Sequence, residues 1–145
     1  MGDMQKNVEQ LNSFLRGEIS AVETYRQAID SLKSTTHGAE LAECKRSHEE
    51  RVAILTEEIR KLGGTPADSS GAWGQFAKLV EGGAKVLGEK AAIDALEAGE
   101  DHGNADYKRD VSKLDPEVRT VIEQKVVPLQ MASHNKMSAL KHQIH

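Results

Sequence analysis

The sequence predicts an all-α protein, a four-helix bundle made of two helical hairpins. The residues that dominate its 145 positions, Ala, Leu, Glu, Lys and Gln, favour helices, whereas aromatic residues make up only 3%. Apolar residues recur at steps of three, four and seven along four long segments, which places them on one face of each helix. Glycine, proline and cap-forming residues separate the segments. We therefore expect a single domain over residues 1–145.

The first two segments predict one hairpin. An apolar stripe indicates a helix over about residues 5–33, and a second stripe runs from Leu41 to Leu62. Ser34–Gly38 separates the two helices, and Gly63-Gly64 provides a stop after the second. Because the connection is short, the two helices are expected to pack as antiparallel neighbours.

The last two segments predict a second hairpin. A third helix carries an apolar stripe from Ile93 to Leu114. Asp115-Pro116 is a strong start for a fourth helix, which we expect to continue to about residue 140. Pro128 lies inside this helix and is expected to kink it, because proline cannot donate a backbone hydrogen bond.

A long crossover over about residues 63–88 would join the hairpins. Its apolar residues predict an extra short helix over 72–87, either capping one end of the bundle or docking to another subunit. The second arrangement would give a homodimer or another homo-oligomer.

The two halves repeat one pattern. Tyr25 follows Glu18 by seven residues, and Tyr107 follows Glu100 by seven. Both glutamates lie on the stripes that should face the core, where a carboxylate is costly unless it is paired, protonated or bound to a metal ion.

The residues resemble known helical proteins. The first helix is similar to that of bacterioferritin and rubrerythrin relatives of the ferritin-like superfamily, through Leu11-Asn12, Leu15, Glu18, Ala21 and Tyr25. The second helix is similar at its end, through His48, Leu55, Leu62-Gly63-Gly64 and Pro66. The whole chain resembles more closely a bacterial ferritin-like domain family of unassigned function, through Ser70–Gly74 and Gly99–His102.

This resemblance implies a ferritin-like fold and an iron or zinc site. Its expected ligands are Glu18, His48, Glu100 and His134. It also implies redox activity, such as iron oxidation or peroxide chemistry. However, di-iron relatives carry Glu-x-x-His on each second helix, and here Lys45 and Met131 stand three residues before the histidines.

A metal-free interpretation stays open beside this one. Counting residues back from the expected turns places His48 and His134 about 9 Å from the two glutamates along the helix axis. Arg51 and Lys125 lie closer to those levels. The alternative is therefore a structural or protein-interaction bundle with Glu18–Arg51 and Glu100–Lys125 ion pairs in place of a metal.

Composition limits the remaining function classes. The net charge of −4 argues against a nucleic-acid partner, and no stretch is apolar enough to span a membrane. One cysteine, Cys44, excludes an intramolecular disulfide. We expect a cytoplasmic protein.

Overall fold

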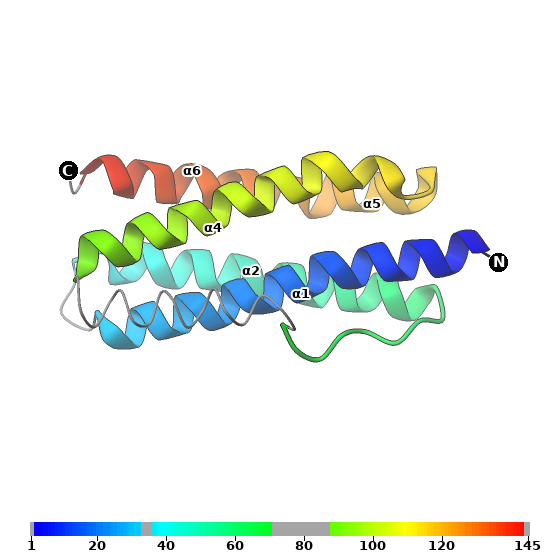
Figure 1. The fold of residues 1–145 in the computed structure, drawn as a ribbon, viewed down its shortest axis with the longest axis horizontal. Coiled ribbons are helices and arrows are strands. Elements are labelled where there is room, and N and C mark those ends of the chain that lie inside the picture. The colour runs from blue at the N-terminus through cyan, green and yellow to red at the C-terminus, as the bar shows by residue number, and fades with distance from the viewer. Residues whose placement is uncertain (1, 33–35, 71–87, 144–145) are drawn as a thin grey trace.

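The computed structural model describes residues 2–32, 36–70 and 88–143. These ranges hold α1 (Gly2–Ser31), α2 (Gly38–Lys61), α4 (Glu89–Asp110), η2 (Val111–Lys113), α5 (Pro116–Lys125) and α6 (Val127–Gln143) (Figure 1). The described ranges contain no strand, and the helices pack as a four-helix bundle, so the predicted fold class is confirmed. The helix expected over 72–87 lies outside the described residues.

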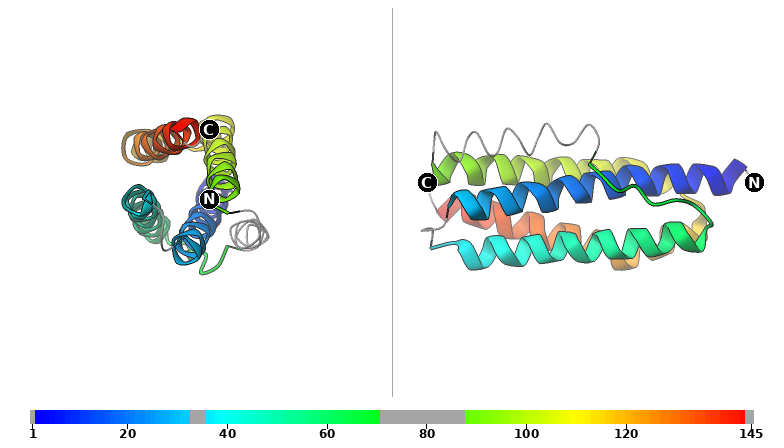
Figure 2. Two further views of the ribbon diagram at one scale, coloured as in Figure 1. Left: turned by 90° about the vertical axis from the view of Figure 1, so that its left-hand side faces the viewer. Right: turned by 90° about the horizontal axis from the view of Figure 1, so that it is seen from below.

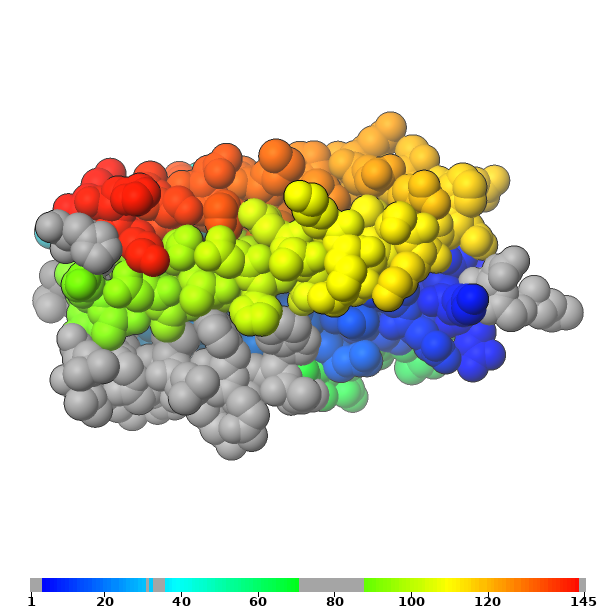
Figure 3. All heavy atoms as spheres, turned by 45° about the horizontal axis from the view of Figure 1, so that its top comes forward, coloured from blue at the N-terminus to red at the C-terminus, as the bar shows by residue number. Residues whose placement is uncertain are grey.

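Each of the long helices α1, α2, α4 and α6 packs against two of the other three. Helix α1 runs antiparallel to α2, and α4 runs antiparallel to α6 (Figures 1 and 2). α1 also packs against α4, and α2 against α6. Because α2 ends at one end of the bundle and α4 begins at the other, the connection between them joins opposite ends. Figure 3 shows the face on which α4 and α6 lie side by side. No described helix is long and apolar enough to cross a membrane.

Two consecutive glycines end α2. Gly63 adopts a φ of 80°, a left-handed conformation that costs glycine little. Gly63 N–H donates to the Arg60 carbonyl and Gly64 N–H to the Ile59 carbonyl, both at 3.0 Å. These are the two hydrogen bonds of a Schellman motif. Gly64 then passes so close to α1 that a Cβ there would lie 2.6 Å from a methyl group of Val8.

Asn12 holds the chain after α2 against α1. Its side-chain amide donates to the Thr65 carbonyl at 3.0 Å, and its Oδ1 accepts from the Ala67 N–H at 2.7 Å. The first residues of the crossover are thereby fixed to the first helix.

Asp115 and Pro116 begin α5, as expected, but the aspartate side chain does not cap that helix. Its Oδ2 instead accepts a hydrogen bond from Asn7 Nδ2 at 3.0 Å, and its N–H donates to Asn7 Oδ1 at 3.1 Å. This reciprocal pair joins the start of α1 to the start of α5.

The expected kink near Pro128 occurs as a break between α5 and α6 at Val126. Beyond the break, the buried positions of α6 are Gln130, Ser133, Met137 and Leu140. Leu129, the residue before Gln130, is only partly buried. Two of the buried positions of α6 are therefore polar, Gln130 and Ser133.

The buried apolar residues form two clusters. One contains Leu11, Phe14, Leu15, Leu55, Ile59, Tyr107, Leu114, Val118, Ile122 and Val126. The other contains Tyr25, Ala28, Leu41, Cys44, Ile93, Leu96, Met137 and Leu140. In the sequence of every long helix, polar buried residues lie between the members of one cluster and those of the other. A polar layer thus divides the core.

The contact at Gly64 gives a stability prediction. Gly64→Ala should destabilise the protein by about 1–3 kcal/mol, because the new methyl group overlaps Val8. Gly38→Ala is the matched control: a Cβ at Gly38 meets nothing within 4 Å, so this variant should be unchanged or more stable by up to about 1 kcal/mol. Urea denaturation of both variants measures the difference, and equal stabilities would refute the close approach.

Candidate functional site: a buried carboxylate, imidazole and guanidinium cluster

Six buried polar residues form the layer between the two apolar clusters. All four long helices contribute to this polar layer, which comprises Glu18 of α1, His48 and Arg51 of α2, Glu100 of α4, and Gln130 and Ser133 of α6. Each is at most 4% exposed. Burying so many polar groups is costly unless every donor and acceptor has a partner.

His48 lies between the two carboxylates. Its Nδ1 is 2.5 Å from Glu18 Oε1, and its Nε2 is 2.8 Å from Glu100 Oε2. A neutral imidazole can donate from only one nitrogen, whereas the imidazolium donates from both. Two carboxylates, one on each nitrogen, therefore favour the protonated ring. Because Glu18 and Glu100 belong to different hairpins, His48 joins the two halves of the bundle.

Arg51 is the second cation of the layer and is fully buried, at 0% exposure. Its Nη1 lies 3.5 Å from Glu18 Oε2 and 2.5 Å from Gln130 Oε1. Its Nη2 donates to Ser47 Oγ at 3.1 Å and to Ser133 Oγ at 2.8 Å, and its Nε donates to the Ser47 carbonyl at 3.3 Å. All five guanidinium N–H groups thus have an acceptor.

The polar side chains of α6 donate hydrogen bonds to Glu100. Gln130 Nε2 donates to Glu100 Oε1 at 3.1 Å and to the Glu100 carbonyl at 3.0 Å, while Ser133 Oγ donates to Oε1 at 2.8 Å. Gly103 makes room for this amide, since a Cβ there would lie 2.9 Å from Gln130. Gln130 and Ser133 therefore link Arg51 to Glu100 without adding charge.

The two tyrosines of the repeat hydrogen-bond across the halves. Tyr25 of α1 donates to Glu100 Oε2 at 2.5 Å, and Tyr107 of α4 donates to Glu18 Oε2 at 2.6 Å. Each hydroxyl group is therefore a hydrogen-bond donor to a buried carboxylate. The rings also pack in the core, with Tyr107 stacked on Phe14 at 4.4 Å between centroids.

Both carboxylates are held in their charged form. Burial alone would raise the pKa of Glu100, but the hydrogen bond and charge of His48, with Tyr25 and Arg51, lower it to about 2. Burial likewise opposes ionisation of Glu18, and Arg51, His48 and Tyr107 lower its pKa. Burial would lower the pKa of His48, but the two carboxylates raise it. Two anions and two cations therefore leave the layer neutral.

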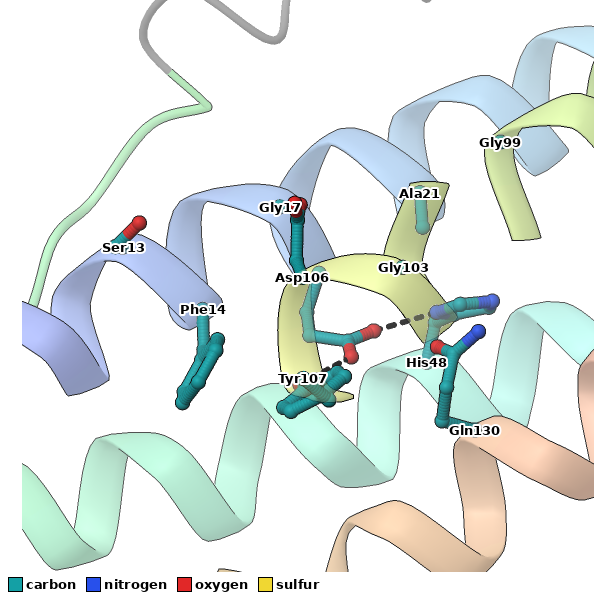
Figure 4. A pocket seen from close by; sticks show the side chains of 11 residues that line it. Ser13, Phe14, Gly17, Ala21, His48, Gly99, Gly103, Asp106, Tyr107 and Gln130 are labelled. Atoms are coloured by element: carbon teal, nitrogen blue, oxygen red, sulfur yellow. Dashed lines mark hydrogen bonds and ion pairs between the residues drawn. The ribbon is translucent and has the colours of Figure 1, made fainter. Parts of the chain in front are cut away.

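Two small cavities lie beside the layer. One, of about 50 Å³, is bordered by Glu18 and His48, and the other, of about 40 Å³, by His48 and Glu100. Figure 4 shows His48, Tyr107 and Gln130 around the first cavity, coming from α2, α4 and α6. Cavities of this size hold one or two water molecules, whereas organic ligands need about 300 Å³ or more.

The structure brings together three of the four expected metal ligands, Glu18, His48 and Glu100. His134 lies elsewhere, with its Nε2 2.5 Å from Asp101 Oδ1. Glu97 is the third member of that group, which we call the surface triad.

The residue levels expected from the sequence were partly wrong. Helix α1 ends at Ser31 and α2 begins at Gly38, so the turn between them lies nearer the N-terminus than expected. Both His48 and Arg51 therefore contact Glu18. The Glu18–Arg51 pair is present. The Glu100–Lys125 pair is absent: Lys125 is exposed, just before the break at Val126, while Glu100 is 2% exposed.

Gln130 and Ser133 were not predicted from the sequence, although a repeat in the sequence marks them. Glu18 and Glu100 are 82 residues apart, as are Tyr25 and Tyr107. The same spacing pairs His48 with Gln130 and Arg51 with Ser133. His134, which we had paired with His48, is four residues beyond the equivalent position.

The donor set does not fit a carboxylate-bridged pair of metal ions. Such bundles use one Glu from each of two helices and a Glu-x-x-His pair from each of the other two. Glu18 and Glu100 match the first two ligands, but the inward pairs at this spacing are His48/Arg51 and Gln130/Ser133. Arg51 brings a fixed positive charge to the layer, and all four carboxylate oxygens already accept hydrogen bonds.

Comparison with known proteins places the chain in one family. Residues 6–123 match the model of the domain of unknown function DUF2383, so the chain belongs to that family. No curated protein and no solved structure matches the chain.

The buried guanidinium gives a stability prediction. Arg51→Met should cost about 3–5 kcal/mol, because it leaves the buried carboxylate of Glu18 short of a cation and removes the donor of Gln130 Oε1. Lys125→Met, the matched control at the exposed lysine, should change stability by less than about 0.5 kcal/mol. Urea denaturation at pH 6 compares the two variants, and similar losses would contradict the assignment of Arg51 as the internal cation.

The layer also predicts how stability depends on pH. The pKa of His48 is raised above its ordinary value of 6.5, so its contribution is complete below pH 6.5 and is lost as pH rises through the raised pKa. The pKa of Glu100 is lowered from 4.5 to about 2, so its contribution is complete above pH 4.5 and is lost as pH falls toward 2. Stability should therefore be highest between pH 4.5 and 6.5.

Denaturation curves of the wild type and of His48→Gln, measured from below pH 4.5 to above pH 6.5, isolate the contribution of His48 to stability. The variant should lose less stability above pH 6.5 than the wild type. His142→Gln, at an exposed histidine of α6, is the control and should follow the wild type. If the free energy of unfolding of His48→Gln falls above pH 6.5 as steeply as that of the wild type, His48 carries no charge in the folded protein.

Proposed function

We propose that this member of the DUF2383 family is a metal-free structural or protein-interaction bundle. In this proposal the polar layer joins the two hairpins through ion pairs and hydrogen bonds, and the biochemical role belongs to the surface of the bundle. This was the alternative interpretation of the sequence, now with His48 and Arg51 as the two internal cations.

One observation carries the proposal: the guanidinium of Arg51 is fully buried beside Glu18, and all of its donors have acceptors. A divalent ion at this place would have to share the layer with that fixed positive charge. It would also have to displace the imidazole and hydroxyl donors that already bind both carboxylates. The neutral layer offers it no excess negative charge.

A second candidate is a single iron or zinc ion held by Glu18, His48 and Glu100. The convergence of these three side chains favours it, because carboxylates and imidazole are ligands for both metals. It requires His48 to lose its proton and Arg51 to remain nearby. Iron oxidation or peroxide chemistry would depend on this candidate.

Metal loading separates the two candidates. Protein purified without a histidine tag is incubated with Fe²⁺ in air, or with Zn²⁺, passed through gel filtration and assayed for bound metal. The experiment uses the His134→Ala variant, because the surface triad could bind metal by itself. We expect far less than one ion per chain, and the same melting temperature with and without a chelator.

One ion per chain in the His134→Ala protein, lost again in a folded Glu18→Gln derivative, would contradict the metal-free proposal. A melting temperature that falls when the chelator is added would do the same. Circular dichroism of both proteins checks that the helices are intact before metal is measured.

A further inference from the structure

The surface triad joins α4 to α6 outside the polar layer. Glu97 and Asp101 stand four residues apart on one face of α4, and His134 reaches them from α6. One ligand atom from each residue lies within 4.8 Å of the other two. The closest pair, His134 Nε2 and Asp101 Oδ1, is 2.5 Å apart. Helices α4 and α6 lie side by side (Figure 3).

The orientation of the two carboxylates is notable because like charges spaced by four on a helix repel. Both nevertheless converge on the imidazole. The nearest cation, Lys141 Nζ, is 3.5 Å from Glu97 Oε1, a long contact from a side chain that is 37% exposed. The two carboxylates and this lysine together carry a net charge of −1, which a bound cation would offset.

The chemistry of the three ligands indicates the class of ion. Imidazole nitrogen with carboxylate oxygen suits zinc and other first-row divalent transition metals, whereas an all-oxygen set would favour calcium or magnesium. Three protein ligands leave a position for water in a tetrahedral site. Ligand atoms around such an ion stand about 3.4 Å apart, so His134 and Asp101 would separate by about 1 Å and the more distant pairs would approach by up to about 1.4 Å.

The three side chains of the triad differ in solvent exposure, and the most exposed one makes the site accessible. The side chains are 12% exposed for Glu97, 21% for His134 and 58% for Asp101. The two more buried ligands are held between the helices, and the exposed aspartate borders solvent. An ion can therefore reach the triad from water.

We propose that Glu97, Asp101 and His134 form a binding site for one Zn²⁺ ion, or a similar first-row divalent ion, that links α4 to α6. This site is independent of the polar layer, so its test does not depend on whether the core excludes metal.

Isothermal titration calorimetry of the untagged wild type with Zn²⁺ tests the proposal. We expect one ion per chain, with binding weakened at least about tenfold in His134→Ala and in Asp101→Asn, because each variant removes one of three ligands. His142→Ala and Glu123→Gln, which change an exposed histidine of α6 and an exposed acid of α5, are the matched controls and should bind as the wild type does.

Co²⁺ gives a second readout that a general electrostatic effect would not produce. Cobalt bound by the triad should show visible absorption bands typical of an ordered low-coordinate site, absent in His134→Ala. Failure of the wild type to bind one Zn²⁺ ion would overturn the proposal. Binding that persists unchanged in His134→Ala would also overturn it, and loss of that binding in Glu18→Gln would assign the ion to the core instead.

Discussion

The imidazole of His48 lies between the carboxylates of Glu18 and Glu100, and the arrangement of the bundle depends on this contact. Glu18 belongs to the first hairpin and Glu100 to the second, so one ring connects both. Without a cation between them, two buried carboxylates would repel and one would take up a proton. The protonated ring removes that repulsion, and Arg51 supplies the second positive charge.

Such a layer constrains packing more tightly than apolar residues would. A leucine that slides along its neighbour keeps most of its contacts. A buried carboxylate that loses its donor is left desolvated with no hydrogen bond in compensation, which destabilises the folded state. Tyr25 and Tyr107 reach across from opposite hairpins, so their hydrogen bonds fix the level of α1 against α4. We infer that the layer sets the register of the helices, as buried polar residues do in some coiled coils.

The fold could be predicted from the sequence because apolar spacing and turn residues are local signals. Glu18 and Glu100 stood out as charges on apolar stripes, and Gly63 with Gly64 marked the end of α2. Gln130 and Ser133 could not be found in this way, because polar residues on a helix are ordinarily solvent-facing. Beyond the break at Val126 they occupy buried positions of α6, while Leu129 is only partly buried. Pro128 signalled a kink, but its sequence position does not specify which side chains beyond it face the core. His48 was placed too far from Glu18 because a small error in the turn displaces every residue on the returning helix.

The repeat of 82 residues explains why both hairpins are needed. Within the polar layer, the first hairpin contributes one carboxylate and two cations, Glu18 with His48 and Arg51, whereas the second contributes one charged group, Glu100. At the positions equivalent to the cations, the second hairpin has uncharged Gln130 and Ser133. The share of the layer that each hairpin contributes is therefore unbalanced, positive for the first and negative for the second. Two copies of one hairpin would double that imbalance, while one of each cancels it. Charge neutrality thus favours the pairing of unlike halves, which the similar apolar stripes of the two hairpins would not distinguish.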